Sequence, residues 1–184
     1  LKRVAQIHSN ELSDGWEIKE VEKKFYMDTR GSTDPAEWKV LNSWEDPLEN
    51  EKSIRIVGVV DRIDIHRERG VYRLLDYKTS KKGPKELHLK NSKVRSEEYP
   101  NYFFFEQNEK TTRWIDLQLP LYKIWAEKVL LDKDIQELEV GIYNVPALEE
   151  QFGPKMWTEL KDDLLREAIV CVGESRKGWL LPDT

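Results

Sequence analysis

The alternation of apolar and polar positions predicts a chain that mixes strands with helices. Residues 54–66 (IRIVGVVDRIDIH) and 71–79 (VYRLLDYKT) are rich in β-branched side chains, which is typical of strands. The short, glycine-containing RERG segment between them predicts an antiparallel hairpin. Residues 16–27 are predicted as a charged strand upstream. Residues 136–145 are predicted as a later strand with Leu138, Val140 and Ile142 on one face.

Helical periodicity appears in three segments. It is weak over 1–12, strong over 114–131, and amphipathic over 154–174. Pro120 lies inside the second segment and predicts a kink or a late helix start. Residues 28–50 carry turn residues and are expected to form a loop or an irregular hairpin, and residues 80–112 a long functional or mobile loop. This order of elements predicts an α/β fold with a mixed central β-sheet flanked by α-helices.

The composition narrows the class of protein. The 184 residues suffice for a single domain spanning 1–184, and seven tryptophans and seven tyrosines indicate a packed core. The lone cysteine, Cys171, excludes an internal disulfide and a four-cysteine metal or iron–sulfur site, and its apolar surroundings favour burial over reactivity. Without a long apolar segment or a signal peptide, we expect an intracellular, cytoplasmic protein that does not contact membranes. The missing initiator methionine suggests the C-terminal part of a longer protein.

Charge adds one local feature to this picture. The net charge of −5 argues weakly against nucleic acid as a partner. The segment from Lys78 to Arg95, however, contains a single acid, Glu86, against a cluster of basic residues: Lys78, Lys81, Lys82, Lys85, Lys90, Lys93 and Arg95. From charge alone, a phosphate-binding surface and a solvated loop are equally consistent with this basic segment.

The predicted hairpin carries charged residues where apolar ones are expected. Asp76 and Lys78 are two positions apart and share one strand face, and Asp61 lies on the neighbouring strand. Charges on strands this apolar must be paired or must bind an ion. Two nearby carboxylates favour a hard divalent cation, and a lysine beside it can orient water or offset charge on a phosphate. The pattern fits metal-assisted phosphodiester hydrolysis, and it also fits a buried ion pair that stabilises the hairpin.

Three ordered motifs narrow this choice. The segments GVVDRID (58–64), LLDYKT (74–79) and DLQLPLY (116–122) resemble the signature motifs of RecB/AddB-type nuclease domains in the PD-(D/E)XK superfamily. Val21-Glu22 resembles a strand found upstream in that family. The resemblance implies a restriction-endonuclease-like core and an exonuclease-like, metal-dependent deoxyribonuclease of prokaryotic type. It implies a role in DNA recombination and repair, beside a helicase subunit or domain.

The resemblance also implies residue roles. Asp61 and Asp76 would bind Mg²⁺ or Mn²⁺ with the Tyr77 backbone carbonyl, and Lys78 would position the hydrolytic water. Gln118 and Tyr122 would hold the site and the DNA backbone. Glu22 would support the metal through water, or would simply pair with a lysine. Arg62 and Asp64 point away from Asp61 and are interpreted as a structural pair. Contacts to single strands or DNA ends would come from Lys81, Lys82 and Lys85.

Some features depart from the family pattern. The family carries a histidine well ahead of the first strand, whereas His8 lies only fourteen residues before Glu22 and is predicted to be a surface residue. His66 and His88 have no partners at ligand spacing and are interpreted as non-ligands, with contact to phosphate as an alternative for His88 in the basic segment. An alternative hypothesis is therefore a catalytically silent nuclease-fold module that binds DNA or scaffolds a helicase–nuclease complex. A third is a stand-alone nuclease in phage, repair or defence systems.

Overall fold

The computed structural model describes residues 2–92, 99–145 and 152–179. In chain order, the elements are α1 (Lys2–Ser13), β1 (Trp16–Asp28), the 3-10 helix η1 (Pro35–Glu37), β2 (Lys39–Leu41), β3 (Arg55–His66), β4 (Val71–Lys78), α2 (Pro84–His88), β5 (Leu89–Asn91), η2 (Asn101–Phe103), β6 (Phe104–Gln107), β7 (Lys110–Trp114), α3 (Gln118–Val129), β8 (Glu137–Asn144), β9 (Gly153–Met156) and α4 (Asp162–Trp179).

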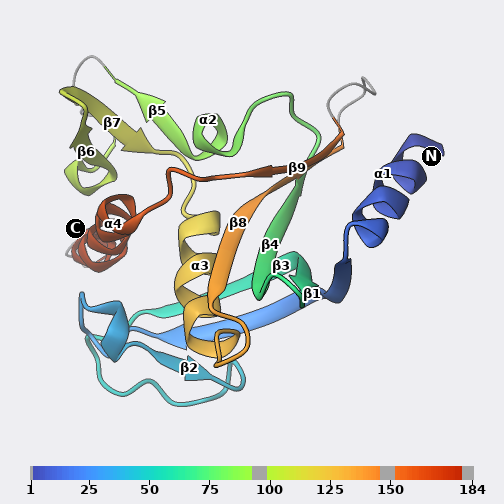
Figure 1. Ribbon diagram of the computed structural model, residues 1–184. Helices are drawn as coiled ribbons and strands as arrows, with labels where there is room; N and C mark the ends of the chain where they lie inside the picture. Colours follow the sequence, from blue (N-terminus) through green and yellow to red (C-terminus); the bar gives the residue numbers. More distant parts are fainter. Residues whose placement is uncertain (1, 93–98, 146–151, 180–184) are drawn as a thin grey trace.

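A six-stranded mixed sheet forms the centre of the molecule, in the order β2-β1-β3-β4-β8-β9 (Figure 1). The predicted hairpin is confirmed, because β3 and β4 pair antiparallel from Arg62–Leu75 to His66–Val71. β8 then pairs parallel to β4 along its whole length. α3 packs against β8 and β4, and α1 contacts β1. The predicted fold class, a mixed central sheet flanked by helices, is confirmed.

Aromatic side chains of β1 and α3 pack together on the face of the sheet that α3 covers. The Phe25 ring on β1 stacks on Trp125 of α3, with 5.3 Å between ring centroids, and meets Tyr122 edge-on at 5.7 Å. Phe25 lies over Gly58 of β3, where an added Cβ would come within 2.5 Å of the ring. The close approach of α3 to β1 and β3 therefore requires glycine at position 58.

The opposite face carries a buried network of charges. Asp64 accepts from Arg62 Nε at 2.6 Å and from Arg73 Nε at 2.8 Å, and it is fully buried. Glu11 of α1 pairs with both arginines, so the network also fastens α1 to the sheet. The predicted Arg62–Asp64 structural pair is confirmed. Both residues are buried and stabilise the contact between α1 and the sheet.

The prediction of a loop over 80–112 is wrong. This region contains α2 and a second, three-stranded sheet in the order β5-β7-β6, drawn above the main sheet in Figure 1. A two-residue turn at Asn108 and Glu109, both with positive φ, joins β6 to β7, and such turns match the twist of a hairpin. The strands have only three to five residues, too few for their alternation to stand out in the sequence.

Two predicted helix starts also need correction. The helix predicted over 114–131 begins at Gln118, because Trp114 ends β7; Pro120 lies in the first turn, where its missing N–H is tolerated. The helix predicted from residue 154 begins at Asp162. Residues 153–156 instead form β9, which pairs antiparallel with the end of β8. In the described part of the chain, no helix is long and apolar enough to cross a membrane.

Candidate active site

Two aspartates lie where the strands of the β3–β4 hairpin separate. The last paired residues of the ladder are Arg62 and Leu75, and Asp61 and Asp76 are the next residues on each strand. Beyond Arg62 and Leu75, a hydrogen bond to a side chain takes the place of backbone pairing between the strands. The Tyr77 backbone N–H donates to Asp61 Oδ2 at 2.8 Å. The carboxylate of Asp61 is thereby held against the end of β4 that carries Asp76.

Asp76 is a buried carboxylate beside a lysine. Its residue is 2% exposed, and Oδ2 lies 2.6 Å from Lys78 Nζ, although no well-directed hydrogen bond reaches that oxygen. Burial raises the pKa of Asp76 above its usual range. Lys78 opposes this rise, and the negative charges of Asp61 and Asp116 add to it. The site thus contains more negative charge than Lys78 alone offsets.

A hydrogen-bonded chain connects this lysine to α3. Lys78 Nζ donates to Gln118 Oε1 at 3.2 Å, Gln118 Nε2 donates to the Tyr122 hydroxyl oxygen at 2.7 Å, and the Tyr122 hydroxyl donates to the carbonyl of Val59 on β3. Burial raises the pKa of Tyr122, as do the nearby aspartates, while the Gln118 hydrogen bond opposes the rise, so the phenol remains a donor at neutral pH. The structure therefore brings together five residues, named below as the aspartate–lysine cluster: Asp61, Asp76, Lys78, Gln118 and Tyr122.

Asp116 is an acid that the sequence prediction did not single out. Its Oδ1 accepts the Gln118 backbone N–H at 2.7 Å, at the start of α3. Its charge acts on Asp76 and on Tyr122, raising the pKa of both. An aspartate just before a helix is a sequence signal for the start of that helix. Asp116 was missed because the helix was predicted to begin at residue 114, which placed Asp116 inside it.

This set of side chains fits a hard divalent cation. Asp61, Asp76 and Asp116 provide carboxylate oxygens, Lys78 balances only one of these charges, and one Asp76 oxygen lacks a well-directed hydrogen bond. Among the described residues, no three His, Cys, Asp or Glu side chains already form a complete metal cage. A cation here would therefore draw on backbone carbonyls and water as well, as Mg²⁺ commonly does.

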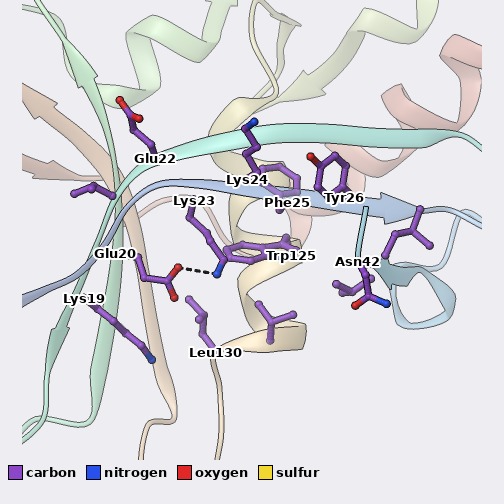
Figure 2. A pocket seen from close by; sticks show the side chains of 14 residues that line it. Lys19, Glu20, Glu22, Lys23, Lys24, Phe25, Tyr26, Asn42, Trp125 and Leu130 are labelled. Carbon is purple, nitrogen blue, oxygen red and sulfur yellow. Dashed lines mark ion pairs between the residues drawn. The ribbon is translucent and has the colours of Figure 1, made fainter. Parts of the chain in front are cut away.

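Glu22 lies on β1 in a strained conformation opposite Asp61. Val21 pairs with Arg62 and Lys23 with Val60, so Glu22 faces the interval that contains Asp61. Its φ of 51° is unusual for a residue other than glycine, and its side chain is exposed. In Figure 2 the Glu22 carboxylate points away from Lys23, so the predicted alternative of a lysine partner does not apply to that neighbour.

A groove of about 750 Å³ runs along β1 beside these residues. Figure 2 shows Trp125 of α3 and Leu130, the residue that follows α3, in the lining of this groove. They lie beside the Lys23–Glu20 ion pair of β1, whose charged atoms are 2.7 Å apart. Neither Asp61 nor Asp76 lines the groove. The groove is therefore separate from the aspartate–lysine cluster, with Glu22 at their border.

The predicted DNA-contacting lysines follow β4 directly. Lys81 and Lys82 are exposed and Lys85 is half-buried at the start of α2. The Lys155 ammonium of β9 joins this end of the sheet and donates to the Lys81 carbonyl at 3.3 Å. Lys93 and Arg95, also part of the basic segment, lie outside the described residues.

His88 lies near enough to the site for the charges of Asp116 and Lys78 to act on its pKa, but it is shielded from solvent. His88 is completely buried, its Nδ1 bonds to the Pro84 carbonyl at 2.8 Å, and burial lowers its pKa. The predicted phosphate contact of His88 is therefore wrong. His8 is half-buried on α1, with Nδ1 3.9 Å from Glu11.

One comparison with known proteins identified a family. The model of the PD-(D/E)XK nuclease superfamily matches residues 2–177, a range that includes the whole aspartate–lysine cluster and both sheets. No curated protein and no solved structure gave a significant match.

Proposed function

The chain belongs to the PD-(D/E)XK nuclease superfamily, and we propose that it hydrolyses DNA phosphodiester bonds with a divalent cation, Mg²⁺ or Mn²⁺, held by Asp61 and Asp76. The observation that carries this proposal is the buried Asp76 carboxylate 2.6 Å from the partly exposed Lys78 ammonium, with Asp61 held beside it by the Tyr77 N–H. Burying a carboxylate without a full set of hydrogen bonds destabilises the folded state. The stability of the hairpin therefore does not account for Asp76, whereas a bound cation does.

The carboxylates of Asp61 and Asp76 supply two anionic ligands, and the Tyr77 carbonyl is a third candidate. Bound there, a divalent cation would polarise the phosphate and lower the pKa of an attacking water. Glu22 is proposed to support the cation through a water molecule. The strained backbone of Glu22 supports this role, because such strain is often retained at functional sites.

Lys78 acts on the reacting atoms in this proposal. Its ammonium orients the attacking water and offsets negative charge that develops on the phosphate oxygens. Gln118 holds Lys78 from α3, and Tyr122 holds Gln118 while its hydroxyl anchors to β3. This chain of contacts limits the positions that the lysine can adopt, which favours a preorganised site.

Lys81, Lys82 and Lys85 are proposed to contact the phosphates of a single strand or of a DNA end. They follow Lys78 directly in the chain, so a backbone bound at the cluster would pass next to them. Their replacement by alanine should weaken DNA binding and flatten its dependence on salt by roughly 2 in log–log slope, since each contact to single-stranded DNA contributes about 0.7. The control is alanine at three exposed lysines outside this segment, Lys52, Lys133 and Lys161.

The finer assignment is a RecB/AddB-like exonuclease domain in recombination and repair, working beside a helicase. It is supported by the order and spacing of the three motifs around Asp61, Asp76 and Gln118. The alternative, a silent DNA-binding or scaffolding module, is disfavoured because Asp61, Asp76 and Lys78 are all present and in contact with one another or with neighbouring groups of the cluster.

The test is degradation of end-labelled single- and double-stranded DNA with Mg²⁺ or Mn²⁺. We expect cleavage by the parent chain, its loss in Asp76→Ala and Lys78→Ala, and parental rates in Lys161→Ala and Asp163→Ala, which alter exposed residues elsewhere. Cleavage that persists in Asp76→Ala would place the chemistry outside this cluster. A folded parent that binds DNA and does not cleave it would favour the silent module. The ladder of products reports polarity, and a circular substrate distinguishes exonuclease from endonuclease action.

A further inference from the structure

Asn144 is a buried amide whose hydrogen-bonding capacity is unused. It is the last residue of β8 and is completely buried, and neither Oδ1 nor Nδ2 has a hydrogen-bond partner within the described structure. Such groups are rare in folded proteins because each loses its hydration on folding without compensation. A side chain of this kind calls for an explanation in terms of function or of an additional bound group.

The position of Asn144 links it to the proposed catalytic lysine. In the parallel ladder of β4 and β8, Ile142 pairs with Asp76 and Asn144 pairs with Lys78. The ladder continues to the end of both strands, where the Val145 N–H donates to the Lys78 carbonyl at 2.8 Å. Paired residues on adjacent strands project from the same face, so the Asn144 amide lies beside the Lys78 side chain on the face that carries Asp76.

Lys78 has donors to spare. Its ammonium has three N–H groups; one donates to Gln118 Oε1 at 3.2 Å, and the nitrogen lies 2.6 Å from Asp76 Oδ2 as an ion pair. Binding of a cation by Asp76 would compete with Lys78 for that carboxylate. Lys78 then needs another acceptor if it is to stay directed at the substrate.

We propose that Asn144 is a positioning residue for Lys78, whose Oδ1 accepts a hydrogen bond from Nζ when Asp76 engages the cation. Gln118 and Asn144 then hold the ammonium from two sides, α3 and β8, and one N–H remains for the attacking water or the phosphate. This inference rests on the proposed nuclease function. It extends that function by assigning a role to a strand that none of the three sequence motifs includes.

The experiment compares Asn144→Leu, which keeps a similar shape without polar atoms, with Asn144→Asp, which keeps the acceptor oxygen. Val140→Ile is the control, a buried position on the same strand that pairs with Leu74 rather than with Lys78. In steady-state DNA cleavage, we expect kcat of Asn144→Leu to fall roughly 10–100-fold, as for other residues that orient a catalytic group, with KM within about twofold of the parent value. Asn144→Asp should retain at least about ten times the kcat of Asn144→Leu.

A second readout does not depend on activity. Since the amide is unpaired in the metal-free protein, Asn144→Leu should melt at the parental temperature or above it. A kcat within about twofold of the parent in Asn144→Leu would overturn the positioning role while leaving the nuclease intact. Equal losses in Asn144→Leu and Asn144→Asp would overturn it too. A parent chain that cleaves no DNA would refute the proposed function itself, and this inference with it.

Discussion

Cation binding at Asp76 should change the stability of the protein by a measurable amount. A ligand that binds only the folded state stabilises it by RT ln(1 + [L]/Kd), which is about 2.7 kcal/mol at a hundred times Kd. For a domain of this size, 1 kcal/mol corresponds to roughly 2–4 °C, so saturating Mg²⁺ or Mn²⁺ should raise the melting temperature by about 5–11 °C. Replacing Asp76 by asparagine should abolish this rise.

The metal-free baseline of the same variant is also informative. Burial raises the pKa of Asp76, so its ionised form is disfavoured in the folded protein relative to the unfolded chain. The folded state therefore binds the Asp76 proton more tightly, and this carboxyl favours folding as pH falls below its raised pKa. Above that pKa it opposes folding, so Asp76→Asn without metal should melt at or above the parental temperature at pH 7.5.

The assay is differential scanning calorimetry of the parent and Asp76→Asn, with EDTA or with increasing Mn²⁺, at pH 5.0 and 7.5. Asp163→Asn is the matched control, an exposed aspartate at the start of α4. The metal-induced rise should be smaller at pH 5.0, because protons compete with the cation for Asp76. A rise of equal size in Asp76→Asn would refute the reasoning, since the cation would then bind elsewhere.

Three further predictions concern the fold. Asp64→Ala should lower the free energy of unfolding in urea by about 3–5 kcal/mol, because it removes the buried partner of Arg62 and Arg73. Arg67→Ala, at an exposed ion pair, should lower it by less than about 1 kcal/mol. Equal losses in the two variants would contradict the structure. Gly58→Ala should lower the free energy of unfolding by about 1–3 kcal/mol in the same assay, because the added Cβ would displace the Phe25 ring. An unchanged urea midpoint would contradict the close packing. Burial raises the pKa of Cys171 to about 12, so little of the thiol is ionised at pH 8. Iodoacetamide at that pH should label the native protein at least roughly a thousandfold more slowly than the urea-unfolded chain, as measured by mass spectrometry. Similar rates would show that this part of α4 opens readily.

Several features of the candidate site were predictable from local sequence. The two-residue period of a strand places Asp76 and Lys78 on one face, and the short glycine-containing connection brings the strand of Asp61 alongside. One helical turn separates Gln118 from Tyr122, so their shared face was also predictable. Each of these relations depends on residues within one element or one hairpin, where backbone geometry alone determines which side chains meet.

Other features depended on contacts between distant segments. The second sheet over 89–114 was missed because its strands are too short for periodicity to show, and the partners of each strand supply the hydrogen bonds that define it. The start of α4 was missed because residues 153–156 pair with β8 instead of continuing a helix.

The sequence by itself determined the hairpin, the alternation that presents Asp76 with Lys78, and the family motifs, because these follow from short-range backbone geometry. Only the tertiary structure decided that Gln118 reaches Lys78, that Asp116 adds its charge to Asp76, and that Asn144 is buried beside the lysine without a partner. These three relations arise from the packing of α3 and the parallel pairing of β8 with β4. The physical reason is that both arrangements depend on the burial of apolar side chains from separate elements, which local backbone geometry does not bring together.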